Sequence, residues 1–485
     1  MAPRKNLNGI LQIKKLVGLD KKKDQFLKAP EPIISLATLD QEYFNKLFDS
    51  IAEHYAVKAT TGYFHLYYLL TNHPVSTNRF NNEYQLVRLY KKRERVFTHG
   101  YTFFSLIKRG RKFLKRNVFM KELPVLDYEI YLSIVEDFRQ ADPRFPNYFG
   151  NKMSKMLYTY NNPSYIDIFC HYLCSRLVEV GRLPNFPLFY GVVGTYFNKW
   201  THKFDDDKEL SDFLEDHGDV SEYFRVIDQE ERKKIEIKGM PVMLMATEQM
   251  DFDMAELIER SNDIYLNSLD DSFDKKEYEE TIASVLFQVM ASLSVVQNLW
   301  TMYHNDLHIG NVMFKRTKEE FIYYCFHGSY YKIPTFGAVT KIIDWNRATL
   351  KFGETELRNS VYDQEGECGS MYIWPKSYGK GESTIEPNPS FDLAILAFEI
   401  ITNDKIINRK GKLYKLLLDL CHIDNGNTLI GHFGKDEEPG FELYRVIASD
   451  CHKAIPENQL GRAFWNQYKI DKSNIPKDKK IYVIL

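Results

Sequence analysis

The spacing of apolar residues changes along the chain from a strand-like pattern to a helix-like one. Short runs of β-branched and aromatic residues predict strands, and they lie at residues 95–97, 101–107, 117–121, 187–193 and 241–246. Runs of this length are typical of the strands in a small sheet. We therefore expect a small antiparallel sheet in the first half of the chain.

Helical spacing interrupts these strands once, over residues 165–180, and stops at Gly181. After residue 250 it dominates. Residues 280–303 are a long, strongly apolar segment, and residues 391–397 begin another buried helix. Strands followed by helices favour an α+β chain with two lobes.

Three segments are expected from this pattern. Residues 1–90 form an N-terminal extension, residues 91–250 a lobe with the sheet and an insertion, and residues 251–485 a helical lobe. The extension is basic at its start and contains prolines, and apolar spacing predicts helices over residues 39–70. No chemistry is visible in the extension, so a docking arm and a lid are both open interpretations.

The composition is that of an ordinary globular protein, because 44% of the 485 residues are hydrophobic and 27% are charged. A net charge of −2 does not indicate nucleic-acid binding. The six cysteines form no Cys-x-x-Cys pair, which argues against a zinc knuckle. The start of the chain lacks an apolar signal core, and apolar runs stay below the about 18 residues that a membrane helix needs. We expect no membrane span and a cytoplasmic location.

The most informative motif is YHNDLHIGNVMF, over residues 303–314. Asp306 and Asn311 lie five positions apart in it, between apolar runs, and Asp344 ends a later apolar run. Transfer of a γ-phosphoryl group needs a carboxylate that orients the attacking hydroxyl and accepts its proton, and hard oxygen ligands that hold Mg²⁺. Asp306 suits the first task, and Asn311 with Asp344 suits the second.

The pattern His-x-Asp-x-x-x-x-Asn, followed by apolar-apolar-Asp, resembles the catalytic loop and the metal-binding aspartate of the protein-kinase-like superfamily. The resemblance implies an α+β, bilobal fold with a small antiparallel-sheet N-lobe and a mainly helical C-lobe, here with an N-terminal extension and insertions. It also implies ATP and Mg²⁺ as cofactors, with Asp306 as the catalytic base and Asn311 and Asp344 as metal ligands.

In protein kinases a lysine grips the ATP phosphates and pairs with a helical acid. The resemblance makes Lys121, at the end of an apolar run, the candidate for the lysine, with Lys108 and Lys115 as alternatives. Asp167 is the candidate acid, although an acid near a helix start is also favoured by the helix dipole alone. Glu179 is the alternative partner.

Two cofactor-binding segments are less well marked. The kinase glycine-rich loop contains G-x-G-x-x-G, whereas this chain offers Gly100 and an isolated Gly110 before the candidate lysine. The loss of glycines limits how closely the backbone can approach phosphates. Residues 243–250 resemble the hinge between kinase lobes, which implies that backbone groups from Glu248 to Met250 bind adenine. A buried strand end is the alternative interpretation.

Several residues depart from the protein-kinase pattern. Protein kinases place Lys two residues after the catalytic Asp, whereas this chain has His308, as do aminoglycoside and choline phosphotransferases and some atypical kinases. His308 is therefore a candidate for contact with the transferred phosphoryl group, or else it ends a helix. Trp345 and Asn346 replace the usual Phe-Gly. Asp392 resembles the buried aspartate that braces the catalytic loop, or caps its own helix.

Three functions remain open on these residues. The first is an ATP-dependent Ser/Thr protein kinase. The second is a small-molecule phosphotransferase of the aminoglycoside or choline type, favoured by His308. The third is a pseudokinase that serves as a structural or interaction module, favoured by the missing glycines.

The divergent glycine loop, the insertion and the high Tyr, Asn and Ile content also resemble kinases of large nucleocytoplasmic DNA viruses. That resemblance implies a protein substrate and viral structural proteins as partners. It also implies the host cytoplasm and the virion as locations.

Overall fold

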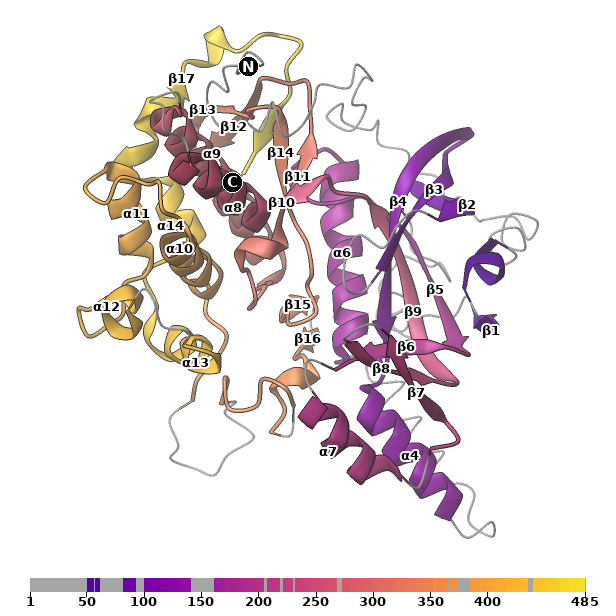
Figure 1. Ribbon diagram of the computed structural model, residues 1–485. Coiled ribbons are helices and arrows are strands. Elements are labelled where there is room, and N and C mark those ends of the chain that lie inside the picture. Colours follow the sequence, from indigo (N-terminus) through magenta and orange to yellow (C-terminus); the bar gives the residue numbers. More distant parts are fainter. Residues whose placement is uncertain are drawn as a thin grey trace, which may run out of the picture. The chain divides into compact units, whose positions relative to one another are not determined.

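The computed structural model describes residues 50–55, 57–61, 82–92, 100–140, 161–204, 207–218, 221–229, 232–267, 273–353, 355–364, 366–373, 384–434 and 439–484. The described residues form two compact units (Figure 1). The sheet unit contains those up to residue 172 together with 188–249. The helical unit contains residues 173–187 and those from 250 onward.

A six-stranded antiparallel sheet, with the strand order β1-β5-β9-β4-β3-β2, is the basis of the sheet unit. Its inner strand β9 (Met240–Glu248) lies between β5 and β4 and is buried at every position. The other strands are β1 (Val57–Thr61), β2 (Tyr84–Lys92), β3 (Gly100–Arg109), β4 (Lys112–Pro124) and β5 (Phe189–Phe197). The strands predicted in β3, β4, β5 and β9 are confirmed.

The N-terminal side of the sheet differs from the prediction. Residues 57–61 form β1, which pairs antiparallel with β5, so the helix predicted over 39–70 is wrong there. Long-range pairing decides the conformation of a segment whose local pattern is ambiguous. The strand β2 begins at Tyr84, so the sheet includes residues that the prediction assigned to the extension. The strand predicted at 95–97 lies outside the described residues.

Inserted elements in the sheet unit have an aromatic core of their own. The insertions comprise α4 (Tyr128–Gln140), α7 (Asp207–His217) and a small sheet of β6 (Trp200–Lys203), β8 (Arg232–Ile237) and β7 (Phe224–Gln229). The ring of Tyr128 stacks on His202 with centroids 4.1 Å apart, and Phe213 of α7 lies 5.8 Å from the Tyr128 ring. Offset contacts of this kind join elements that are separate in sequence.

Helix α6 (Pro163–Glu179) carries Asp167 in the sheet unit. Proline in the first helical position suits the start, since its missing N–H would have no partner there. The helix stops before Gly181, whose φ of 68° lets the chain turn back over the last carbonyl groups. The helix predicted over 165–180, with its stop at Gly181, is confirmed.

The long helix α9 (Lys275–Trp300) is the core of the helical unit, because every residue from Thr281 to Val296 is buried. By length and composition α9 could cross a membrane, but 83% of its most apolar window is buried inside the protein. The apolar character is therefore explained by a core position. The other helices are α8 (Met254–Asn267), α10 (Phe391–Asn403), α11 (Lys412–Leu420), α12 (Leu429–Phe433), α13 (Phe441–Asp450) and α14 (Pro456–Leu460).

Small sheets complete the helical unit (Figure 1). One joins β10 (Phe252–Asp253), β11 (Val312–Arg316) and β14 (Ala338–Ile342). Between β11 and β14 the chain inserts a hairpin of β12 (Phe321–Phe326) and β13 (Ser329–Pro334), flanked by β17 (Lys469–Ile470) and β18 (Ile481–Val483). The short elements are β15 (Leu350–Phe352), β16 (Thr355–Leu357) and the 3₁₀ turns η2 (Ile309–Asn311), η3 (Ser360–Tyr362), η4 (Ala463–Tyr468) and η5 (Lys472–Asn474).

The hairpin closes through a two-residue turn, His327-Gly328, since Phe326 pairs directly with Ser329. Both turn residues have positive φ, 45° and 76°. A turn with two positive φ values matches the right-handed twist of the flanking strands.

Candidate active site

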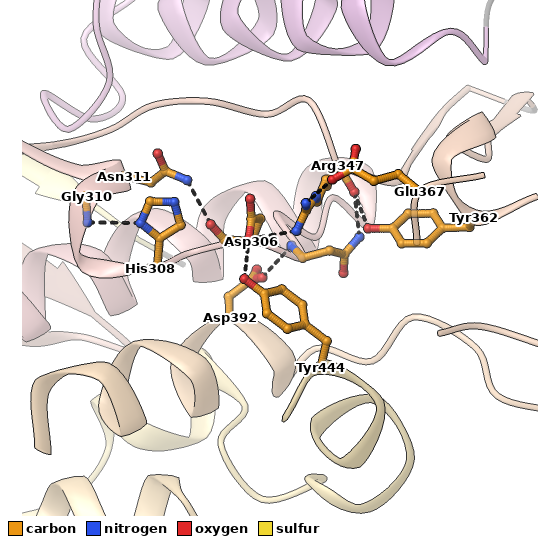
Figure 2. A network of polar contacts seen from close by, with 10 residues as sticks. Asp306, His308, Gly310, Asn311, Arg347, Tyr362, Glu367, Asp392 and Tyr444 are labelled. Atoms are coloured by element: carbon orange, nitrogen blue, oxygen red, sulfur yellow. Dashed lines mark hydrogen bonds and ion pairs between the residues drawn. The ribbon is translucent and has the colours of Figure 1, made fainter. Parts of the chain in front are cut away.

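A buried carboxylate holds the loop that follows α9. Asp392, in the first turn of α10, accepts the backbone N–H of His304 at 3.0 Å and that of Asn305 at 2.8 Å (Figure 2). Burial raises the pKa of Asp392, while the hydrogen bonds from His304 and Asn305 act in the opposite direction. Of the two interpretations of Asp392, these contacts fit the brace rather than a cap of its own helix.

The His304 side chain connects this loop to Asp344. Its Nε2 donates to the Ile343 carbonyl at 2.8 Å, and its ring lies 4.6 Å from that of Trp345. Trp345 is fully buried, which gives this position a packing role. Asp344 has a φ of 64°, a left-handed conformation that costs about 1–2 kcal/mol for a non-glycine residue. The backbone before Asp344 is thus fixed from one side by His304.

Asn311 and Asp344 lie at the same end of one strand pair. In the β11–β14 register Val312 faces Ile342, and the Asn311 carbonyl accepts the Ile343 N–H at 3.1 Å. The Asn311 amide nitrogen donates to the Asp306 carbonyl at 2.9 Å, which orients the amide. Amide and carboxylate oxygens are hard donors of the kind that Mg²⁺ prefers, so the chemistry of these two residues fits the implied ion.

Asp306 is held by two side chains from later segments (Figure 2). Its Oδ1 accepts the Tyr444 hydroxyl at 2.6 Å and lies 3.3 Å from Nη1 of Arg347, which also pairs with Glu367. The side chain of Asp306 keeps 14% of its surface exposed. Burial and the neighbouring Asp306 both raise the pKa of Tyr444, so its hydroxyl stays protonated and donates.

The neighbouring backbone fixes the tautomer of His308. Its Nδ1 accepts the Gly310 N–H at 3.1 Å at the start of η2, so in the neutral ring the proton is on Nε2. A side chain at Gly310 would bring its Cβ within 2.9 Å of the His308 ring. The imidazole therefore offers an N–H donor in a fixed orientation.

In the sheet unit Lys121 pairs with Asp167, with Nζ and Oδ2 2.8 Å apart. Asp167 is 0% exposed and also faces His171, whose Nδ1 lies 3.0 Å from Oδ1. Burial alone would raise the pKa of Asp167, but the Lys121 ammonium and His171 outweigh it and hold that pKa well below its usual range. Lysine and acid therefore meet as the sequence resemblance implied.

The alternative candidates for the lysine, Lys108 and Lys115, and for its acidic partner, Glu179, lie in other surroundings. Lys108 lies in β3, Lys115 is exposed on β4, and Glu179 pairs with Arg176 at the end of α6.

The structure places Gly100 in a strand. It is the first residue of β3 and faces Lys121 in the β3–β4 register, whereas the resemblance implied a phosphate-covering loop. A Cβ at Gly100 would lie 2.5 Å from the Met120 carbonyl oxygen, so close strand packing explains this glycine. Residues 93–99, which connect β2 to β3, lie outside the described residues.

Glu248 ends β9 and is buried. Its N–H donates to the Leu188 carbonyl at 2.8 Å, and its carboxylate accepts the Leu188 N–H at 3.3 Å. The Glu248 N–H is therefore engaged in the sheet unit, and adenine binding through that donor is not supported. Met250 follows as a buried residue of the helical unit.

Sequence reasoning missed three residues of this network: Asn305, Arg347 and Tyr444. The Asn305 amide donates to the Arg347 carbonyl at 3.1 Å and accepts the Tyr372 hydroxyl at 2.8 Å. Tyr444 lies 138 positions from Asp306. Asn305 lies inside the motif at its unspecified position, and Arg347 and Tyr444 lie outside it, so the motif spacing carries no signal for these contacts.

The fold is protein-kinase-like. A unit built on an antiparallel sheet and a mainly helical unit are both present, and the catalytic-loop pattern follows the buried helix α9 directly. The fold class expected from the sequence is confirmed.

No family model matches the chain. Among curated proteins it is similar to the serine/threonine-protein kinase haspin. Identity is 38% over 71 residues of the Bos taurus protein and 38% over 93 residues of the Mus musculus protein. With the haspin homolog of Arabidopsis thaliana it is 31% over 87 residues. These alignments cover 15%, 18% and 18% of this chain but only 9%, 12% and 14% of those relatives.

Similar solved structures include the ROP18 kinase domain in complex with AMP-PNP and sucrose, with 8% identity and a TM-score of 0.33. The alignment covers 80% of this chain and 83% of that one. ROP2 from Toxoplasma gondii, described as a virulence factor with a protein-kinase fold and no enzymatic activity, has 10% identity and a TM-score of 0.30. That alignment covers 78% of this chain and 87% of ROP2. Superpositions this loose carry no inference about activity.

Proposed function

We propose that this protein is an ATP- and Mg²⁺-dependent phosphotransferase, a divergent Ser/Thr protein kinase that transfers the γ-phosphoryl group of ATP to a protein hydroxyl. The observation that carries the proposal is the joint fixation of Asp306, Asn311 and Asp344. Asn311 bonds to the backbone at Asp306 and at Ile343, so the backbone segments that carry the three residues are joined. The similarity to haspin kinases points to the same class of reaction.

Each residue has a defined task in this proposal. Asp306 orients the acceptor hydroxyl and takes its proton as the oxygen attacks phosphorus. Asn311 and Asp344 hold Mg²⁺, which supplies charge neutralisation on the phosphates when bound. His308 donates its Nε2 proton as a hydrogen bond to a phosphoryl oxygen. Lys121, oriented by Asp167, binds ATP phosphate.

A pseudokinase is the second candidate. It is favoured by the contacts of Asp306, whose Oδ1 is already engaged by Tyr444 and Arg347. A small-molecule phosphotransferase is the third, and His308 favours it. The likeness to viral kinases stays a prediction. So do its implications, which are virion proteins as partners and the host cytoplasm or the virion as the location. The protein substrate and the absence of a membrane span are also predictions.

Radiolabelled transfer from γ-labelled ATP separates these functions. We expect casein to be labelled in preference to aminoglycosides and choline, and the Asp306→Asn variant to lose turnover by about 10²–10⁴-fold while still binding MgATP. Asp344→Ala should abolish the rise in melting temperature that MgATP causes. Asp363→Asn, at an exposed carboxylate, is the matched control and should behave as wild type. Wild-type protein with no MgATP-dependent shift would favour the pseudokinase.

A further inference from the structure

The Tyr444 hydroxyl lies at the distance from Asp306 Oδ1 at which an acceptor hydroxyl would contact a general base. A general base must lie within about 2.6–3.2 Å of the oxygen whose proton it takes, and Tyr444 Oη lies 2.6 Å from Asp306 Oδ1. Figure 2 shows the ring reaching up from α13 to the carboxylate. An alcohol that approaches the same Oδ1 must therefore compete with this phenol.

Tyr444 is not needed to hold the Asp306 backbone in place. The loop around Asp306 is fixed by the Asp392 carboxylate on one side and by the Asn311 amide on the other. Arg347 is anchored through its own backbone carbonyl, which accepts from Asn305 and from the Tyr362 hydroxyl. The hydrogen bond from Tyr444 is thus an addition to a loop that is already positioned.

The surroundings of Tyr444 determine how its hydroxyl can be withdrawn from Asp306. Tyr444 is the fourth residue of α13, whose N-cap Gly440 provides no side-chain hydrogen bond. Glycine at the N-cap costs roughly a few tenths of a kcal/mol relative to a capping side chain, so the first turn of α13 is only slightly weakened. Release of Asp306 needs rotation of the side chain or movement of this turn, and it breaks the contact between the Tyr444 ring and that of Phe391, whose centroids lie 5.9 Å apart.

Arg347 contributes to the same arrangement. Its guanidinium carbon lies 5.7 Å from the centre of the Tyr444 ring, while Nη1 faces the Asp306 Oδ1 that accepts the phenol. The cation holds the ring and the carboxylate together. Arg347 therefore contacts both partners of the hydrogen bond that an acceptor would have to replace.

We propose that Tyr444 is an internal occupant of the acceptor site, which masks Asp306 until a protein acceptor displaces its hydroxyl. This inference rests on the proposed phosphotransferase function. The preferred acceptor is then a segment of a substrate protein. Its hydroxyl takes over the hydrogen bond to Asp306 that Tyr444 makes, and its neighbouring residues fill the space beside Arg347 that the Tyr444 ring leaves. Water, which replaces only the hydroxyl, displaces Tyr444 poorly.

The test compares wild type with Tyr444→Phe, which removes the hydroxyl and keeps the ring. We expect kcat/KM for casein to rise about tenfold, because a hydrogen bond to a charged group must be broken in the wild type alone. ATP hydrolysis without casein should rise as well, and the KM for ATP should stay unchanged. Tyr444→Met is the second variant in case Phe disturbs folding, which melting temperature reports.

Tyr468→Phe is the matched control. It removes a buried tyrosine hydroxyl that has no partner among the described residues, and it should leave both rates as in wild type. If Tyr444→Phe transfers phosphate to casein and the wild type does not, the result supports the proposal that Tyr444 masks Asp306. Wild-type transfer that Tyr444→Phe lowers or leaves unchanged overturns the mask and leaves the phosphotransferase standing. If no variant transfers phosphate although each binds MgATP, the proposed function is wrong and the mask is wrong with it.

Discussion

At the residue scale, two aspartates of the helical unit divide the work at one loop. Asp306 keeps part of its surface accessible and is held by side chains, whereas Asp392 is enclosed and accepts two backbone N–H groups. The first is suited to reaction and the second to support. Their different surroundings allow the two roles to be tested separately.

Asp392→Ala should lower the free energy of unfolding by about 3 kcal/mol, because two buried N–H groups lose their acceptor. Phosphate transfer should fall with it, since the loop at His304 and Asn305 is released. Urea unfolding and labelled-ATP assays measure the two effects. Asp419→Ala, which breaks a partly exposed pair with Arg462, should cost less than about 1 kcal/mol. An equal loss of unfolding free energy in Asp392→Ala and Asp419→Ala would contradict the bracing role of Asp392.

The Lys121–Asp167 pair predicts a dependence of stability on pH. The pKa of Asp167 is lowered in the folded state, so the unfolded state binds the proton first as pH falls. The stabilisation is complete above the unfolded pKa of about 3.9 and declines below it. Near neutral pH, Asp167→Asn should cost about 3 kcal/mol. Urea titrations in a pH series should show this difference shrinking towards about pH 3, and a constant difference would refute the assignment.

At the element scale, the β3–β4 pair places Lys121 by close backbone contact. Gly100 is buried opposite Lys121, and the Met120 carbonyl and the Phe119 ring occupy the space that a Cβ would need. The position of Lys121 thus depends on the lack of a side chain at Gly100.

Gly100→Ala should therefore separate the two strands at Lys121, lower stability by about 1–3 kcal/mol and weaken MgATP binding. Gly218→Ala is a suitable control in the same unit, because a Cβ at that exposed glycine meets no atom within 4 Å. Thermal unfolding with and without MgATP compares the two variants. Similar behaviour of both would show that the contact at Gly100 is not limiting.

Local pattern predicted the elements whose own residues determine them. Helix α9 is dominated by apolar residues over a long stretch, and β4 contains the short apolar run Val118-Phe119-Met120, so both were visible in the sequence. Strand β1 could not be predicted from the local sequence, because its pairing with β5 decides its conformation. The Tyr444–Asp306 contact was invisible for the same reason, since only the folded chain brings α13 to the catalytic loop.

At the scale of the whole molecule, segments distant in sequence close the helical unit. Strand β18 pairs in parallel with β12, and the Ile484 carbonyl accepts from Arg182, which follows α6. Ile484 is fully buried, whereas the adjacent Val483 is 42% exposed. Residues near position 484 therefore belong to the core of the helical unit, the same unit that contains the catalytic loop around Asp306.

Ile484→Ala should lower the free energy of unfolding by about 2–4 kcal/mol, because it leaves a cavity in that core. Val483→Ala should stay within about 0.5 kcal/mol of wild type, as exposed positions do. Denaturant unfolding followed by fluorescence compares the two. An Ile484→Ala variant as stable as Val483→Ala would mean that the closing segment is dispensable.

The hairpin β12–β13 has a practical consequence for anyone who wishes to label this protein. Asn311 and Asp344 are aligned by the β11–β14 register, so the length of the chain between those strands does not set their alignment. The tip at His327-Gly328 therefore offers an insertion point for an epitope or a fluorophore. A reporter placed there leaves the register of the two metal-ligand candidates as it is.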